Sequence, residues 1–108
     1  HLAVALDTGH TTVEGTNSWP IQANLLRPHL GALYVKDYAW IENKKTNVPL
    51  GRGNVDSGYP KRLLKSGYTG PVNLHVEYLK PFSKENVPKQ IAAIKRDVGT
   101  LRKWLGWT

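Results

Sequence analysis

Three short apolar segments of the sequence each end in residues that can bind a metal ion or transfer a proton. The segments lie near residues 2–6, 32–36 and 72–76 and have the composition of short buried β-strands. Carboxylate and imidazole groups bind Mn²⁺, Mg²⁺, Co²⁺ or Zn²⁺. Such an ion would polarise a sugar oxygen while a carboxylate moves a proton on the adjacent carbon. The chemistry-bearing residues are Asp7 and His10 at the first segment, Lys36 and Asp37 at the second, and His75 and Glu77 at the third.

Helical patterns follow each of these predicted strands. We expect a short helix from a cap at Ser18 to about Pro28, a second over Tyr59–Ser66, and a C-terminal helix after a cap at Ser83 or Asn86. The polar stretch 11–17 and the long segment 39–56 are predicted as loops. The alternation of strands and helices favours parallel pairing, which brings the strand ends to one rim. The apolar stripe of the C-terminal helix comprises Ile91, Ile94, Val98, Leu101 and Leu105.

The turn after the first predicted strand argues against a nucleotide-binding domain. Its sequence D-T-G-H (residues 7–10) is neither G-x-G-x-x-G nor a P-loop. Because each strand instead delivers polar residues at its carboxyl end, we expect a segment of a (β/α) barrel.

Each candidate residue also has a structural interpretation. In that interpretation Asp7 and His10 cap the following loop, and Lys36 with Asp37 form a surface ion pair at the end of a strand. Strand alternation places Asn73, His75 and Glu77 on one face, which points into a barrel or merely toward water. The four tryptophans are expected to pack in the core, with Trp40 in the long loop as the exception.

The composition limits the class of protein. A chain of 108 residues forms one domain at most, or a piece of one. It has no cysteine, which excludes disulfides and thiolate metal sites. The formal charge of +7 is spread along the chain, so we expect a solvated basic surface, no nucleic-acid partner and no membrane association. No apolar run approaches the ~18 residues of a membrane span, and we expect a cytoplasmic location.

Four motifs together resemble a known family. They are D-T-G-H, Y-V-K-D-Y, L-G-R-G-N-V-D and G-Y-T-G-P-V-N-L-H-V-E-Y, in this order. They are similar to the last three βα units of the xylose isomerase-like sugar phosphate isomerase/epimerase barrels. The resemblance covers nearly the whole chain and implies a partial TIM (β/α)₈ barrel domain over residues 1–108. It further implies a metal-dependent enzyme that interconverts sugars or sugar phosphates.

The resemblance also implies roles for single residues. Asp7 corresponds to a metal ligand of the family and His10 to a substrate contact, while Arg52 of the L-G-R-G loop lies near the substrate. We predict Asp7 and His75 as metal ligands and Glu77 and Lys36 as catalytic residues. The predicted substrate-binding residues are His10, Arg52 and Trp40.

Two positions differ from the family pattern. Tyr34 stands where the family has a metal-binding histidine, and His75 stands where it has a glutamate. The alternative function is therefore a non-catalytic sugar-binding protein that has lost its metal site. Since a complete barrel needs about 250 residues, we expect this chain to be inactive alone. Its partner would be the missing N-terminal half of the barrel or further copies of itself.

Overall fold

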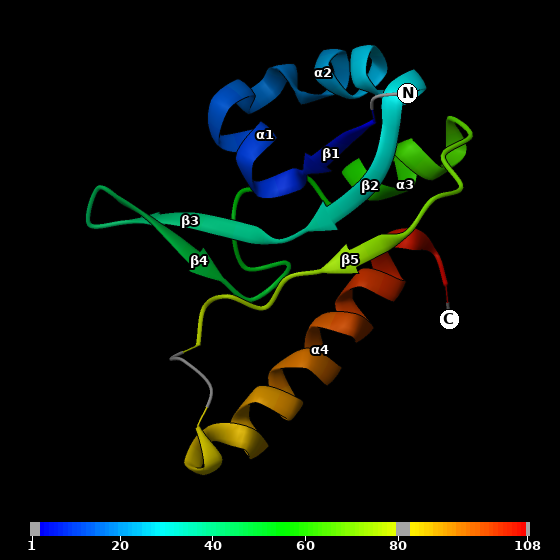
Figure 1. Ribbon diagram of the computed structural model, residues 1–108. Helices are drawn as coiled ribbons and strands as arrows, with labels where there is room; N and C mark the ends of the chain where they lie inside the picture. Colours follow the sequence, from blue (N-terminus) through cyan, green and yellow to red (C-terminus); the bar gives the residue numbers. More distant parts are fainter. Residues whose placement is uncertain (1–2, 80–82, 108) are drawn as a thin grey trace.

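A computed structural model describes residues 3–79 and 83–107 of the chain. Three parallel strands form one sheet in the order β1-β2-β5, with β1 at Val4–Asp7, β2 at Leu30–Val35 and β5 at Val72–Leu74. Figure 1 shows the three strands running in the same direction, so that their carboxyl ends share one edge. The predicted strands and their parallel pairing are thus confirmed, with ends shifted by one or two residues.

Within the described residues, four helices accompany the sheet. They are α1 (Thr8–Gly15), α2 (Trp19–Leu26), α3 (Tyr59–Lys65) and α4 (Val87–Leu105), with short 3₁₀ turns at Thr16–Ser18, Arg27–His29 and Lys84–Asn86. The predicted loop over 11–17 is wrong, because helix α1 begins directly after β1. Asp7 stabilises that start, since its Oδ1 atom accepts the backbone N–H of His10 at 3.0 Å, as an N-cap residue does.

A separate two-stranded antiparallel hairpin lies next to the sheet. It consists of β3 (Asp37–Ile41) and β4 (Lys44–Val48), joined by Glu42 and Asn43, which both have positive φ angles. Only Lys36 separates β2 from β3, so the hairpin continues the path of β2 past the edge of the sheet (Figure 1). The prediction of an irregular segment over 39–56 is therefore wrong for its first half.

The core lies on one face of the parallel sheet. The side chains that alternate toward it include Leu6 of β1 and Leu33 and Val35 of β2, all at most 1% exposed. On the other face Ala5 and Asn73 are exposed and Tyr34 is half-buried. The buried core cluster is completed by residues of α2, α3 and the loops, namely Ala23, Leu50, Tyr59, Leu63 and Tyr68.

The interpretation as part of a TIM barrel is wrong. The structure is a small α/β domain with an open three-stranded parallel sheet, a two-stranded hairpin and four helices. A βα unit has the same local sequence pattern in an open sheet and in a barrel, because the pattern records only which face of each element is buried. The pattern therefore predicted the strands correctly but wrongly predicted that they belong to a closed barrel.

The apolar stripe predicted on the last helix is only partly covered. Leu105 is buried and Leu101 packs against the core, whereas Ile91, Ile94 and Val98 are 48%, 46% and 39% exposed. The side of α4 that faces the protein also carries the buried Asp97, which accepts the hydroxyl of Tyr78 at 2.8 Å. No helix within the described ranges is long and apolar enough to cross a membrane.

Tyr59 connects helix α3 to α1 and α2. It is fully buried, its ring stacks on Trp19 with centroids 4.3 Å apart, and its hydroxyl lies 2.8 Å from Oγ1 of Thr11. Burial raises the pKa of the Tyr59 hydroxyl above its ordinary value of 10.0, against the opposing effect of the Thr11 hydrogen bond; the charge of Asp7 raises it further.

The raised pKa of Tyr59 predicts a pH-dependent contribution to stability. Because the folded state holds the proton more tightly, the contribution is fully present below the unfolded-state pKa of 10.0 and falls as the pH rises above it. Tyr59→Phe should cost about 1 kcal/mol at neutral pH through the lost hydrogen bond. Urea unfolding should show this difference shrinking above pH 10. A difference that stays constant through that range would contradict the assignment.

Candidate functional site

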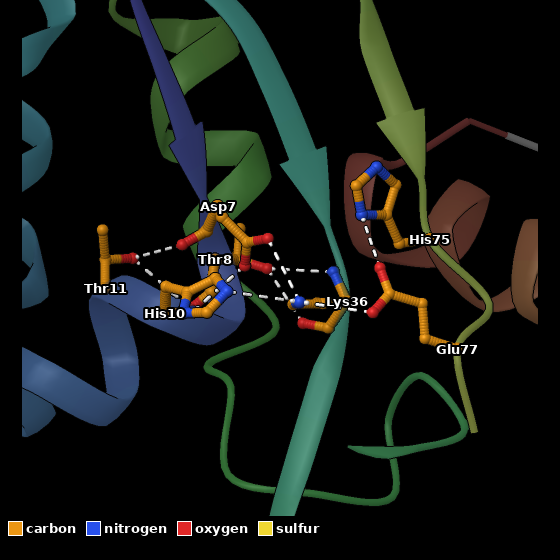
Figure 2. Close-up of polar contacts among 7 residues, drawn as sticks. All are labelled: Asp7, Thr8, His10, Thr11, Lys36, His75 and Glu77. Carbon is orange, nitrogen blue, oxygen red and sulfur yellow. Dashed lines mark hydrogen bonds and ion pairs between the residues drawn. The ribbon is translucent and has the colours of Figure 1, made fainter.

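Lys36 lies at the centre of a polar cluster at the carboxyl ends of the parallel strands. Its Nζ atom is 3.5 Å from Oδ2 of Asp7 and 3.6 Å from Oε2 of Glu77. It is also 3.4 Å from Nε2 of His10. Figure 2 shows the side chains converging from β1, the start of α1, the end of β2 and the segment after β5. We call Asp7, His10, Lys36, His75 and Glu77 the Lys36 cluster.

The strand geometry explains why these residues meet. Alternation along β1 and β2 turns Asp7 and Lys36 away from the core face that holds Leu6 and Val35. Parallel strands end at the same edge of the sheet, so residues far apart in sequence become neighbours there. The prediction that the strand ends share one rim is confirmed.

Thr8 joins the end of β1 to the end of β2. It is fully buried, its Oγ1 donates a hydrogen bond to the carbonyl oxygen of Lys36 at 2.9 Å, and the same atom accepts the Lys36 N–H at 3.2 Å. The backbone of Lys36 is thus fixed against the start of α1. The sequence analysis missed Thr8, since a threonine in a turn carries no signal of a bond across 28 residues.

The carboxylates of the cluster differ in exposure. The side chain of Asp7 is 17% exposed and that of Lys36 is 10% exposed, whereas Glu77 is 47% exposed. Asp7 is held on both sides, by the His10 N–H and by Lys36. Glu77 therefore presents the more accessible base, and Lys36 presents a cation largely shielded from water. For Lys36 to donate to His10, Nε2 of His10 must be the unprotonated ring nitrogen.

His75 approaches the cluster from the open face of the sheet. Its ring lies against that of Tyr34, with centroids 4.7 Å apart. Its Nδ1 atom is 3.0 Å from Oε1 of Glu77, yet it is buried and forms no hydrogen bond among the described residues. The contact has the distance of an ion pair without the alignment of a hydrogen bond. A small rotation of Glu77 would pair the two groups.

Asp37 directly follows Lys36 in the sequence, but its side chain lies outside the Lys36 cluster. Its carboxylate is 2% exposed and accepts four backbone N–H groups. Oδ1 accepts those of Tyr38 at 2.9 Å and Val55 at 3.0 Å, and Oδ2 accepts those of Gly51 and Gly53, both at 3.0 Å. The interpretation of Lys36 and Asp37 as a surface ion pair is wrong, because both are buried and their side chains have different partners.

The loop bound by Asp37 needs glycine at two positions. Gly51 has a φ of +87°, and a Cβ atom on Gly53 would overlap the carbonyl oxygen of Tyr38. These glycines let the backbone curl around the carboxylate. The G-R-G part of the sequence motif is therefore explained by the anchoring of the loop.

The structure does not bring Arg52 or Trp40 to the Lys36 cluster. Arg52 is exposed in the loop, where its backbone N–H donates to the carbonyl oxygen of Pro49 at 2.9 Å. Trp40 lies on β3, is 57% exposed and meets the ring of Tyr38 edge to face, with centroids 6.2 Å apart. Their predicted roles in substrate binding stay predictions.

Within residues 3–79 and 83–107, no group of three or more His, Asp or Glu side chains is placed to hold a metal ion. The predicted ligands Asp7 and His75 both lie in the Lys36 cluster. However, the ammonium group of Lys36 already lies between the carboxylates of Asp7 and Glu77. A divalent ion would need that same position. In the described arrangement these residues do not fit the ion, and the predicted metal site stays a prediction.

Comparisons of the chain with models of known protein families and with curated proteins give no match. The resemblance to the xylose isomerase-like barrels therefore stays a hypothesis based on the sequence motifs.

The anchoring role of Asp37 gives a stability prediction. Asp37→Asn replaces one acceptor oxygen by an N–H group that faces backbone donors, so the free energy of unfolding should fall by about 2–4 kcal/mol. Urea unfolding measures the change. The matched control is Asp56→Asn, since the side chain of the exposed Asp56 accepts only the N–H of Gly58 among the bonds described, at 2.7 Å. Its cost should stay below about 1 kcal/mol. Equal losses in the two variants would show that the loop does not depend on Asp37.

Proposed function

We propose that the protein transfers a proton between neighbouring carbon atoms of a small sugar or polyol, as an isomerase or epimerase. The observation that supports this is the position of Lys36 Nζ, 3.6 Å from the half-exposed carboxylate of Glu77 and 3.5 Å from that of Asp7. A cation that can polarise a carbonyl oxygen thus lies beside a base that can remove a proton from the adjacent carbon. The cytoplasmic location expected from the sequence belongs to this proposal.

The reaction follows from the two groups. Glu77 removes the proton from the carbon next to the carbonyl, and the electron pair of that C–H bond forms the C=C bond of an enediol. Lys36 donates a proton to the former carbonyl oxygen and accepts one from the neighbouring hydroxyl. Glu77 then returns its proton to the former carbonyl carbon, so that the carbonyl has moved by one position. In an epimerase Lys36 instead recovers its proton from the former carbonyl oxygen, and Glu77 protonates the original carbon on its opposite face after the enediol has turned over relative to Glu77.

The remaining cluster residues have positioning roles in this scheme. Asp7 holds the ammonium group of Lys36 in place, and its own orientation is fixed by the N–H of His10. His10 is exposed and lies 3.4 Å from Lys36 Nζ, where it can contact a substrate hydroxyl. His75 lies 3.0 Å from Glu77 and can orient the base.

Exchange of substrate hydrogen with solvent tests the proposal without knowledge of the product. In D₂O, a sugar that is a substrate should gain deuterium at the carbon next to its carbonyl, as followed by proton NMR on aldoses, ketoses and their phosphates. Glu77→Gln and Lys36→Met should each lower the exchange rate at least about 100-fold. Glu85→Gln, an exposed carboxylate in the turn before α4, should leave the rate unchanged.

Two outcomes would overturn the proposed reaction. One is exchange that persists in both Glu77→Gln and Lys36→Met. The other is sugar binding without any exchange in the unmodified protein, which would favour the alternative of a non-catalytic sugar-binding protein.

A titration with Mn²⁺ tests the metal ligands predicted from the sequence. If Asp7 and His75 bind the ion, Lys36 must move aside, and the melting temperature should rise with Mn²⁺ concentration because the ion binds only the folded state. Asp7→Asn should then remove this rise. A melting temperature independent of Mn²⁺ would leave Lys36 as the cation of the site and would rule out the two predicted ligands.

A further inference from the structure

A cavity of about 520 Å³ opens beside the hairpin, and none of its lining residues belongs to the Lys36 cluster. Its walls come from α1, the start of α2, strand β3 and the loop that follows β4 (Figure 1). The volume falls within the roughly 300–1,000 Å³ of small-molecule sites. The residues that matter for the argument are Thr12, Trp19, Tyr38, Trp40, Asn54 and Asp56.

Thr12 supplies the first observation that points to a ligand. It lies on α1, is 4% exposed, and lines the cavity. Its Oγ1 atom is buried and has no hydrogen-bond partner among the described residues. Buried hydroxyl groups in proteins are almost always paired. Because this oxygen is covered in the unliganded structure, a polar ligand supplies the missing partner once the side chain of Thr12 rotates toward the cavity that it lines.

The aromatic wall supplies the second observation. Trp40 is 57% exposed, and the ring of Tyr38 meets it edge to face at a centroid distance of 6.2 Å. An edge-to-face contact occupies at most one face of an indole, and Trp40 is 57% exposed, so one face of its ring is open to another group. Trp19, in contrast, stacks on Tyr59, and the guanidinium group of Arg62 lies 6.0 Å from the Trp19 ring. Trp40 is therefore the ring that can stack on a ligand.

The polar wall is held in place before any ligand binds. The backbone N–H of Asn54 donates to the carbonyl oxygen of Tyr38 at 2.8 Å. Oδ1 of Asp56 accepts the N–H of Gly58 at 2.7 Å, which orients that carboxylate. Asp37, at the start of β3, accepts the backbone N–H groups of Gly53 and Val55. It thereby fixes the loop on both sides of Asn54. The backbone at Asn54 and the carboxylate of Asp56 are thus held in place before a ligand binds, which lowers the entropy cost of binding.

The charge of the lining selects the class of ligand. Asp56 is the charged residue of the lining, and the other residues that form it are neutral. Two cations lie close to lining rings, since Lys45 Nζ is 5.9 Å from the centre of the Tyr38 ring and the guanidinium group of Arg62 is 6.0 Å from that of Trp19, but neither residue lines the cavity. The carboxylate of Asp56, which does line it, disfavours phosphorylated or carboxylated ligands. An open indole face combined with hydroxyl, amide and carboxylate groups suits a neutral molecule that has an apolar face and many hydroxyls.

We propose that this cavity is a binding site for a neutral carbohydrate. Trp40 stacks on the apolar face of a sugar ring, Oγ1 of Thr12 bonds one of its hydroxyls, and Asn54 and Asp56 bond others. The site is distinct from the Lys36 cluster, and its occupancy does not require catalysis there. It would hold a second sugar unit or a separate sugar molecule.

NMR of the four tryptophan indole N–H groups tests the proposal directly. D-Glucose and D-xylose are titrated to about 100 mM, well above the millimolar Kd of a small ligand held by few contacts. The resonances of Trp40 and Trp19 should shift, and those of Trp104 and Trp107 should not. D-Glucose 6-phosphate should bind at least about tenfold more weakly than glucose, because its charge meets Asp56. An absence of shifts at Trp40 with both neutral sugars would overturn the proposal.

Variants separate this site from the Lys36 cluster. Trp40→Ala and Thr12→Val should each raise the Kd for the sugar several-fold or more, and Thr12→Val keeps the shape of the buried side chain. Trp107→Ala, at an indole that is 53% exposed, is the matched control and should bind normally. Lys36→Met should also bind normally here. Binding lost in Lys36→Met and retained in Trp40→Ala and Thr12→Val would move the sugar to the cluster and overturn the second site, while leaving the proposed function standing.

Discussion

The carboxylate of Asp37 organises the part of the protein that carries its candidate sites. Four backbone N–H groups from the hairpin and the following loop converge on this one buried side chain. Taking a carboxylate out of water costs several kcal/mol unless donors replace the lost hydration. Here the donors come from backbone that has no regular partner of its own. The backbone N–H groups therefore stabilise the buried carboxylate of Asp37, and the carboxylate holds the loop in its conformation. Without these bonds neither would be stable in this place.

Much of the parallel sheet could be predicted from the sequence. The apolar segments near residues 2–6, 32–36 and 72–76 are strands because their side chains pack under helices, and burial leaves a direct trace in composition. Helix α1 and the hairpin could not be predicted in the same way. Helix α1 depends on the cap by Asp7, and the hairpin depends on Asp37, which acts across 14 to 18 residues. Closure into a barrel is a property of distant neighbours, and local pattern carries no information about it.

The residues of the candidate site likewise divide into those that the sequence predicts and those that it does not. Asp7, His10, Lys36, His75 and Glu77 were found from their chemistry and their places at strand ends, and they lie together in the structure. Thr8 and Thr12 were missed, because a threonine becomes informative only when its partner, or the lack of one, is known. Trp40 is the predicted exception among the tryptophans, and it lines a cavity that is separate from the Lys36 cluster. Residue type thus predicts what a side chain can do, and geometry decides with which partner.

The single residue between β2 and β3 has a consequence for how this sequence can change over evolutionary time. Along an extended chain, successive side chains point to opposite sides. Lys36 consequently meets Asp7 and Glu77, while Asp37, one position later, meets the loop. Inserting one residue in β2 would place the ammonium group among N–H donors, and deleting one would place a carboxylate among carboxylates. The number of residues in this strand is therefore constrained independently of which residues they are.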